Sequence, residues 1–381
     1  MRILLVGEYS RIHNSLKEGL IELGHEVTLI GDKDFKGYPV DISVYAKVLK
    51  ENYFLNKIRQ VIYRLFDLDI AQIENAVRFY FVRKKVINYD IVQLVNEYPI
   101  QSTLFFEKKI VNYIFKNNKN VFLSSCGDDF ICVNYMLNGG FSYSVLTPCE
   151  TNPKLGHCKF TLAFAKKEFY ELHKLVFENI KAVIPADMDY AIPLRNHPKA
   201  LPLIPNPINL IKNKFSPLVI EDKIIIFHGI NEVNYYKKGN GFFEKALEII
   251  SLKYRNKVEV ITTRSIPYDT YIKLYDSCHI LMDQVYGYDQ GYNALEAMAK
   301  GKVVFTGAEK EFMEHYNLKE RVCVNALPDV DSLVKELCYL IENPTELIAM
   351  GKRARAFIEK EHDYVAVAGK YLENWKIKAN T

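Results

Sequence analysis

A glycine-containing loop and the short apolar helix after it hold the first residues that could do chemistry. Residues 286–305 read YGYDQGYNALEAMAKGKVVF, and Gly291 immediately precedes the helical pattern. The first amides of a helix have no partner within it and lie at the positive end of its dipole, so an anion can bind there. Those amides belong to Tyr292, Asn293 and Ala294.

Glu296 follows about one turn further along the same predicted helix. A carboxylate at this place can accept hydrogen bonds from two ribose hydroxyls, as an acidic residue does in other nucleotide sites. Its alternative role is compensation of the helix dipole, which is worth about 0.3–1 kcal/mol. Taken alone, the glutamate leaves both roles open.

A second loop in the same half of the chain supplies positive charge. The stretch HGINEVNYYKKGNGFF starts at His228 and ends in Lys237, Lys238 and Gly239 before a helix. A lysine next to glycine at a helix start suits a phosphate, although the loop could also be only an exposed connection. Together with Glu296, Lys238 favours a nucleoside diphosphate as the ligand.

Two loops in the first half of the chain follow predicted strands. The first, GEYSRIHN, has Gly7 and Glu8 but lacks the Gly-x-Gly-x-x-Gly pattern, which argues against NAD and FAD. The second, SSCGDD, has Gly127, Asp128 and Asp129. Paired acids can bind Mg²⁺ with a phosphate, or they can cap the next helix.

The order of apolar runs predicts the elements that position these loops. RILLVG, HNSLKEGLIELG and VTLIG read as strand, helix and strand, and KIIIFHGI, GNGFFEKALEIISLKY and VEVITT repeat that order later. ALPLIPNPI is predicted as one more strand. We expect an α/β protein with two Rossmann-like doubly wound domains facing across a cleft. The expected parts are residues 1–208, a linker at 209–222, residues 223–362 and a final helix at 363–381.

Length and composition fit two globular domains and exclude several classes of protein. The chain has 381 residues and a formal net charge of +4, too mild to indicate nucleic acid as a partner. No signal peptide or membrane-spanning run is visible, and the seven scattered cysteines suggest reduced thiols, so we expect a cytoplasmic protein. Cys149 with His157 and Cys158 lacks a second short-spaced pair, which argues against zinc.

One segment is locally basic. Residues 57–85 set lysines and arginines among aromatic and aliphatic residues at helical spacing. They could form an interfacial helix pair that touches anionic lipid, which would place the protein peripherally on the inner face of the cell membrane. They could also form two amphipathic helices packed on a core with a solvated basic face.

Several of these stretches resemble one known family. The segment in which Gly291 is followed, after a gap, by ALEAMAKGKVV is one of them. It resembles the nucleotide-sugar signature of retaining glycosyltransferases with the GT-B fold, of the family-four (group 1) type. LIPNPIN resembles that group's Pro-Asn-Gly-Ile/Val-Asp segment, and KKGNGFFEKALE its Lys-Gly helix. The tail MGKRARAFIEKEHDYVAVAGKYLENW resembles its C-terminal helices. The likeness is close in the second half of the chain and general in the first half.

The resemblance implies a donor sugar on a nucleoside diphosphate, UDP- or GDP-linked, held by the C-terminal domain. Glu296 would bind the ribose, residues 291–294 the diphosphate, and Lys238 the charge of the leaving group. The acceptor would lie near Gly7, Glu8 and residues 126–129. The last helix would cross back to the N-terminal domain. No cofactor and no divalent metal are expected.

The sequence departs from the family pattern at three places. The first of two spaced glutamates is replaced by Tyr288, with Asp289 next to it. An arginine before the Lys-Gly loop is missing, and Arg264 is a possible substitute. Cys126 stands where a histidine is common. The candidate catalytic residues are Lys238, Asp289 and Asp128. The candidate donor ligands are Glu296, Gly291, Tyr292, Asn293, Ala294, Lys238, Arg264, Tyr288 and His228. The candidate acceptor-side residues are Gly7, Glu8, Cys126, Gly127 and Asp129.

The expected reaction is transfer of a sugar, with retention, to a surface polysaccharide or a lipid-linked glycan. Two alternatives stay open. The chain could be a glycosyltransferase-like binding or scaffold protein that lost catalysis through the changes at Tyr288 and Cys126. It could also be a nucleotide-sugar 2-epimerase, for which Asp128, Asp129 and His13 are the available acid and base groups.

Overall fold

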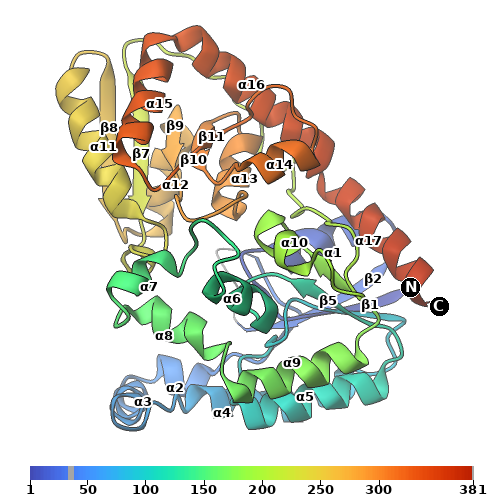
Figure 1. The fold of residues 1–381 in the computed structure, drawn as a ribbon. Coiled ribbons are helices and arrows are strands. Elements are labelled where there is room, and N and C mark those ends of the chain that lie inside the picture. Colours follow the sequence, from blue (N-terminus) through green and yellow to red (C-terminus); the bar gives the residue numbers. More distant parts are fainter. Residues whose placement is uncertain (33–37, 380–381) are drawn as a thin grey trace.

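The first half of the chain folds around a parallel sheet (Figure 1). The computed structural model describes residues 1–32 and 38–379. The sheet has the strand order β3-β2-β1-β4-β5-β6, and every neighbouring pair is parallel. Its strands are β1 (Arg2–Val6), β2 (Glu26–Gly31), β3 (Ile42–Ser43), β4 (Ile91–Leu94), β5 (Val121–Ser125) and β6 (Val183–Pro185).

Helices cover both faces of this sheet because alternate strand residues point to opposite sides. In β1, Leu4 and Val6 pack in the cluster with α4, α5 and α9, while Ile3 and Leu5 pack with α1 and α17. The helices of this half are α1 (Ile12–Glu22), α2 (Lys47–Glu51), α3 (Tyr53–Phe66), α4 (Ala71–Val82), η1 (Arg83–Lys85), α5 (Leu104–Asn117), α6 (Phe130–Leu137), α7 (Thr147–Thr151), α8 (Gly156–Ala163), α9 (Lys167–Asn179) and α10 (Met188–Leu194).

The second half of the chain also has helices packed on a parallel sheet, and it has its own hydrophobic core. Its parallel sheet has the order β11-β10-β9-β7-β8, from β7 (Ile224–Ile230), β8 (Val258–Arg264), β9 (Ile280–Met282), β10 (Val303–Thr306) and β11 (Val324–Asn325). Its helices are η2 (Glu232–Asn234), α11 (Asn240–Lys253), α12 (Tyr268–Ser277), α13 (Tyr292–Ala299), α14 (Lys310–His315), α15 (Val330–Glu342), α16 (Pro344–Glu361) and α17 (Tyr364–Ala379). The predicted fold class, two doubly wound domains, is confirmed.

The last helix, α17, leaves the second domain and lies on the first, beside α1 (Figure 1). The two helices pack closely at Gly19, where an added Cβ would lie 2.2 Å from the carbonyl oxygen of Tyr364. Further along, the fully buried Trp375 donates its indole N–H to Oε1 of Gln93 on β4, at 2.9 Å. The C-terminal helix is therefore part of the N-terminal domain's core.

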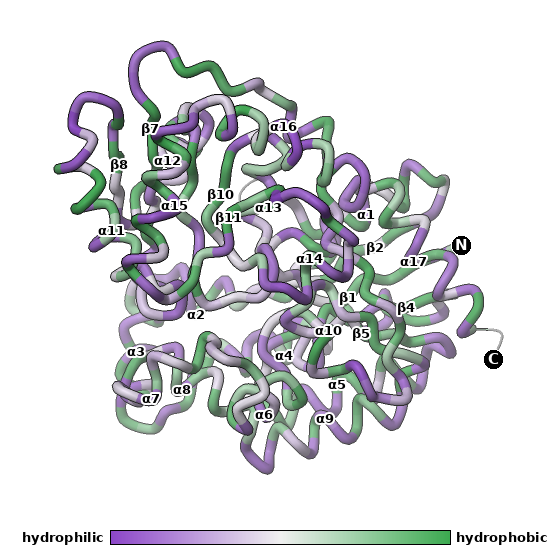
Figure 2. Tube along the Cα trace, turned by 45° about the horizontal axis from the view of Figure 1, so that its top comes forward, coloured by the Kyte–Doolittle hydropathy of each residue, from purple (hydrophilic) through white to green (hydrophobic). Residues whose placement is uncertain are grey.

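Two expectations about local structure are corrected. Residues 200–208 contain isolated bridges rather than a strand, because Ala200 pairs only with Val183 and Ile208 only with Asp363. In the basic segment, the alternative of two helices packed on a core holds for α4 only, because no residue of α3 is buried. Figure 2 shows the trace of α3 alternating between hydrophobic and hydrophilic residues at the edge of the molecule. Within the described residues no helix is both long and apolar enough to span a bilayer.

Candidate functional site

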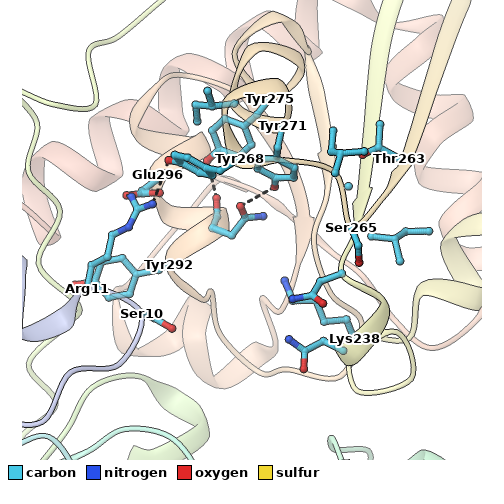
Figure 3. A pocket seen from close by; sticks show the side chains of 17 residues that line it. Ser10, Arg11, Lys238, Thr263, Ser265, Tyr268, Tyr271, Tyr275, Tyr292 and Glu296 are labelled. Atoms are coloured by element: carbon cyan, nitrogen blue, oxygen red, sulfur yellow. Dashed lines mark hydrogen bonds and ion pairs between the residues drawn. The ribbon is translucent and has the colours of Figure 1, made fainter. Parts of the chain in front are cut away.

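A cavity of about 490 Å³ opens between the two domains, at the carboxyl ends of β7 and β8 (Figure 3). Ser10 and Arg11 line it from the loop after β1, and Lys238, Asn293 and Glu296 line it from the second domain. In doubly wound sheets ligands bind beyond the carboxyl ends of the strands. The sequence-predicted donor ligands Glu296, Tyr292, Asn293 and Lys238 all meet at this cavity.

The start of α13 and the lysine loop are joined by a buried carboxylate, Asp283. Its Oδ1 accepts a hydrogen bond from Nζ of Lys238 at 2.7 Å and another from Nδ2 of Asn293 at 2.9 Å. The helix α13 begins after Gly291, and its first internal bond runs from the amide of Leu295 to Gly291. The start of α13 and the Lys238 ammonium therefore lie close together, and Tyr292, Asn293 and Lys238 line the same cavity.

The position of Lys238 also depends on the glycine after it. Gly239 caps α11 with φ of 68°, and an added Cβ would lie 2.1 Å from Cγ2 of Val285. In the opposite direction, the amide of Val285 donates to the carbonyl of Lys238 at 3.1 Å. The close approach of Gly239 to Val285 and this hydrogen bond hold the lysine loop against the segment after β9, which contains Asp283.

Glu296 meets a residue of the other domain. Arg11 donates from Nη1 to Oε1 of Glu296, and from Nη2 to the hydroxyl of Tyr268 at 3.2 Å. Burial is the largest single influence and disfavours the arginine's charge, but Glu296, Tyr38 and Tyr268 together outweigh it and raise the pKa of Arg11. The carboxylate predicted for ribose binding thus lies on the cavity wall, already paired across the cleft.

A row of tyrosines on α12, Tyr268, Tyr271 and Tyr275, lines another part of the cavity wall. The rings of Tyr268 and Tyr271 are stacked, with centroids 6.5 Å apart. Tyr271 donates to Oδ1 of Asn293 at 2.9 Å, and Tyr275 donates to the carbonyl of Asn293 at 2.7 Å. These tyrosines and Asp283 are not among the candidate ligands identified from the sequence. Their spacing of three and four residues along one helix face is the signal that could have found the tyrosines.

Comparisons with known proteins agree with this geometry. Residues 233–373 match the family described as glycosyl transferase-like, while the search of curated proteins gives no match. The chain carries a glycosyltransferase domain on a GT-B fold. The predicted resemblance to GT-B glycosyltransferases and the prediction of a glycosyltransferase are confirmed at this level.

Solved structures of the same fold match this chain over nearly its whole length. Sucrose-phosphate synthase from Thermosynechococcus elongatus is 16% identical with a TM-score of 0.63, covering 99% of this chain and 98% of its own. HepE from Anabaena, in complex with UDP-glucose, is 12% identical with a TM-score of 0.58, covering 99% of each chain. UDP-GlcNAc 2-epimerase from Neisseria meningitidis, bound to UDP-GlcNAc, is 14% identical with a TM-score of 0.51, covering 98% and 99%.

Tyr288 and Asp289 connect the two domains. The hydroxyl of Tyr288 accepts from the amide of Ser142 at 2.8 Å, and its ring lies 4.6 Å from that of Phe141. Oδ2 of Asp289 accepts from the amide of Met188 at 3.0 Å. Burial raises the pKa of the Asp289 carboxyl. The carboxyl group accepts from one backbone amide of α10, and it is next to Tyr288, the residue that replaces the first glutamate of the family pattern.

A smaller cavity of about 200 Å³ lies beside Asp289 and Gly291. Asp128 and Gly127 line it from the first domain and Lys237 from the second. Oδ2 of Asp128 accepts from the hydroxyl of Thr161 at 2.8 Å and lies 3.8 Å from Nζ of Lys237. The structure thus brings Asp128, Gly127, Asp289 and Gly291 to one place, next to the larger cavity.

Two predicted donor ligands lie outside the larger cavity. His228 is buried behind Gly229 and bonds to Oδ1 of Asn240 at 2.8 Å, and burial lowers its pKa. It therefore orders the start of α11. Arg264 is exposed and forms ion pairs with Glu232, at 2.6 Å, and with Glu244. Neither side chain is among those that line the cavity.

The remaining acceptor-side residues support the N-terminal loops. A Cβ on Gly7 would lie 2.5 Å from Cγ1 of Val95, so packing within the domain requires this glycine. Glu8 accepts from the amide of Asn14 at 2.7 Å, and burial raises its pKa to about 7. Asp129 caps α6 by accepting from the amide of Cys132 at 2.7 Å. Cys126 packs, partly buried, against the apolar cluster of Ile12, Val95 and Ala186.

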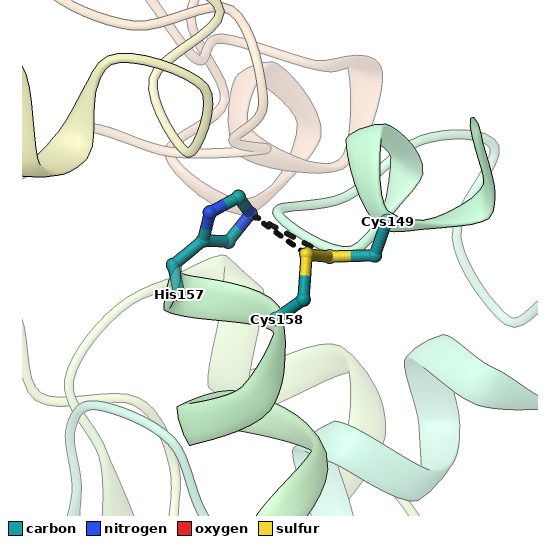
Figure 4. Close-up of side chains that lie close together, drawn as sticks. All are labelled: Cys149, His157 and Cys158. Atoms are coloured by element: carbon teal, nitrogen blue, oxygen red, sulfur yellow. Dashed lines mark hydrogen bonds between the residues drawn. A yellow bond between two sulfur atoms is a disulfide. The ribbon is translucent and has the colours of Figure 1, made fainter. Parts of the chain in front are cut away.

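The expectation that all cysteines are reduced is wrong for two of them. Cys149 on α7 and Cys158 on α8 form a disulfide, because the short connection brings their Cα atoms to 5.7 Å (Figure 4). His157 lies against the bridge, with Nε2 3.5 Å and 3.6 Å from the two sulfur atoms. These three residues form the one His, Cys and carboxylate group of metal-binding size found in residues 1–32 and 38–379. With its sulfurs joined, that group lacks the thiolates that bind zinc.

Proposed function

We propose that this glycosyltransferase moves a sugar, with retention, from a UDP- or GDP-linked donor to a surface-polysaccharide or lipid-linked glycan acceptor. One observation carries the proposal: Glu296, Lys238 and the first amides of α13 line one cavity between the domains. These are the partners that a ribose and a diphosphate need. Two of the similar structures, HepE and the UDP-GlcNAc 2-epimerase, have UDP-glucose and UDP-GlcNAc bound.

The proposed donor spans the larger cavity. Its base stacks near Tyr268 and Tyr271, and its ribose hydroxyls donate to Glu296. Its diphosphate accepts from the amides of residues 292–294 and from Lys238, which Asp283 holds in place. The sugar then extends past Gly291 into the smaller cavity, toward Asp128, Asp289 and Lys237.

The proposed chemistry relies on electrostatic stabilisation of the leaving group. The bond from the anomeric carbon to the diphosphate oxygen breaks, and the electron pair leaves with the diphosphate. The acceptor hydroxyl attacks from the same face and gives its proton to the departing phosphate oxygen. Lys238 and the α13 amides stabilise the charge that develops, which removes the need for a divalent metal in this proposal. Activity that survives chelation by EDTA would support that part.

Nucleotide binding and donor turnover test the proposal. Calorimetric titration with UDP and GDP should give binding, and Glu296→Ala should weaken it about 10- to 100-fold because hydrogen bonds to a charged acceptor are lost. Hydrolysis or transfer is then measured across a panel of nucleotide sugars. Lys335→Ala, at an exposed lysine on α15, is the matched control. The proposal fails if no nucleoside diphosphate binds, or if Glu296→Ala and Lys238→Ala equal the parent.

A second function, binding without catalysis, is favoured by one observation. Tyr288 and Asp289, at the place of the family's sugar-facing acid, are engaged in contacts between the domains. Tight nucleotide binding without turnover for any donor would support this alternative. A 2-epimerase would instead incorporate deuterium at C2 of a UDP-sugar in D₂O, which separates the third possibility from both.

A further inference from the structure

The helix α3 presents a row of apolar side chains to solvent. Phe54, Ile58, Val61 and Leu65 have exposed fractions of 76%, 52%, 57% and 68%. Their spacing of four, three and four residues places them along one face of the helix. We call these four residues the α3 stripe. Such a row normally faces a protein core, and here it faces outward.

The outward direction of the stripe is fixed by the other face of the same helix. Arg59 donates to both carboxylate oxygens of Asp69 at 2.6 Å, and α2 contacts both α3 and α4. Asn52 caps the helix by accepting from the amide of Leu55 at 3.1 Å. The helix is thus attached to the domain through Arg59 and the contacts with α2, while the four stripe residues stay exposed. Figure 1 shows α3 at the edge of the molecule.

Positive charge borders the stripe. Residues 53–66 contain no acidic side chain, and Lys57 and Arg64 lie on one flank of the four apolar residues. The basic run Arg83–Lys85 follows at the end of α4, after the exposed Phe81. Residues 53–85 hold seven basic and three acidic side chains, and the acids are already in ion pairs with Lys159, Arg59 and Arg78.

We propose that the α3 stripe inserts into the headgroup region of a bilayer that contains anionic lipid. Charge decides between a membrane and a protein partner: an apolar row flanked by cations and free of acids complements a negative surface. Phe54 and Leu65 would enter the acyl boundary while Lys57 and Arg64 pair with lipid phosphates. Membrane binding by the α3 stripe would determine where the protein acts, and it does not depend on the sugar-transfer reaction.

The same surface leads toward the smaller cavity. Asp67, directly after α3, forms an ion pair with Lys159 of α8, and Thr161 of α8 donates to Asp128 at the cavity wall. A bilayer at the stripe would therefore lie on the α8 side of the cleft. If the proposed function is right, this arrangement favours a lipid-linked acceptor over a soluble one.

Vesicle flotation with the full chain tests the inference. The wild type should float with equimolar phosphatidylcholine and phosphatidylglycerol, and stay in solution with phosphatidylcholine alone or at high salt. Ile58→Ser with Leu65→Ser, and separately Lys57→Glu with Arg64→Glu, should each lower the bound fraction at least about tenfold. The matched controls are Ile249→Ser with Leu252→Ser on α11, and Lys335→Glu with Lys352→Glu, which should float like the wild type.

The outcomes are distinct. Equal flotation of wild type and stripe variants, or no flotation at all, overturns the inference. A dimer in light scattering that the stripe variants convert to monomer, without vesicle binding, also overturns it, because the occupant is then a second copy. UDP and GDP binding is measured in the same samples and should be unchanged in the stripe variants. Failure of the proposed function would instead appear as lost nucleotide binding with flotation intact.

Discussion

Arg11 of the N-terminal domain donates to Glu296 of the C-terminal domain, across the cavity predicted to hold a nucleotide. The arginine adopts φ of 79°, beside Ser10 at φ of 49°. Positive φ at two successive non-glycine residues is uncommon and costs about 1 kcal/mol or more each. The contacts of the Arg11 guanidinium with Glu296 and Tyr268 compensate for that cost and hold the β1 loop against the second domain.

A double-mutant cycle measures this contact. Arg11→Met and Glu296→Gln, alone and combined, are compared in urea unfolding monitored by circular dichroism. Because both side chains are mostly buried, we expect a coupling energy of about 2 kcal/mol. The matched exposed pair Lys310 and Glu314 should give about 0.5 kcal/mol or less. Equal coupling energies in the two pairs would mean that the Arg11–Glu296 contact stabilises the fold no more than an exposed ion pair does.

The contact between Asp283 and Lys238 supports a prediction about turnover. Lys238→Met should lower kcat about 100- to 1000-fold, because a positive group at the leaving diphosphate is lost. Asp283→Asn keeps an acceptor for Asn293 but removes the charge that holds Lys238, so a fall of about tenfold in kcat is expected. Lys245→Met, at an exposed lysine of α11, is the control. An Asp283→Asn enzyme with full kcat would show that Lys238 needs no such support.

Local sequence was enough to select Glu296 and Lys238, which meet at the larger cavity, and Gly291, which lines the smaller one beside it. Gly291, Glu296 and Lys238 each belong to one loop and the helix start beside it, so their chemistry could be read within a few residues. The alternation of strands and helices gave the two domains for the same reason. Asp283 and Tyr271 were missed because their significance depends on Asn293, which lies 10 and 22 residues further along the chain and is in contact with them only in the folded domain.

Contacts between domains could not be predicted from either domain alone. Asp289 looked like a candidate to replace the family's first glutamate, but its carboxyl group accepts from the amide of Met188 in the other domain.

Contacts within a domain were also missed. Arg264 looked like a donor ligand, but the neighbouring acids Glu232 and Glu244 hold it at the surface. In α3 the apolar pattern predicted a packed face, and no residue pattern tells whether such a face meets a core.

Asp289 should make stability depend on pH. Burial raises its pKa from an ordinary 3.8 to about 7. Between about pH 4 and 7 the folded protein keeps a proton that the unfolded chain releases, so the free energy of unfolding falls as the pH rises through this window. Asp289→Asn is neutral in both states and lacks this contribution. Its free energy of unfolding, relative to wild type, should therefore be higher at about pH 8 than at about pH 5.

Urea unfolding of both proteins at the two pH values checks this difference. Buried carboxyls distant from Asp289, such as Glu8 and Glu107, contribute to the slope of both proteins and cancel in the comparison. Asp187 and Asp189 interact with Asp289, and loss of its charge in the variant changes the difference in the same direction. Asp331→Asn, at an exposed residue of α15, is the control and should show no pH-dependent difference. A constant difference between Asp289→Asn and wild type at both pH values would contradict the prediction.

Two glycines test the docking of the C-terminal helix. Gly19→Ala places a Cβ 2.2 Å from the carbonyl oxygen of Tyr364 and 2.8 Å from Cβ of Ala368, so α17 must shift, and we expect a loss of about 1–3 kcal/mol in unfolding free energy. Gly369→Ala on α17 meets nothing within 4 Å and should stabilise the helix by about 0.5–1 kcal/mol. Trp375 is the sole tryptophan and is buried under the N-terminal sheet, so its fluorescence reports on this docking alone. An unchanged emission spectrum and stability in Gly19→Ala would mean that α1 and α17 do not pack as closely as the structure has them.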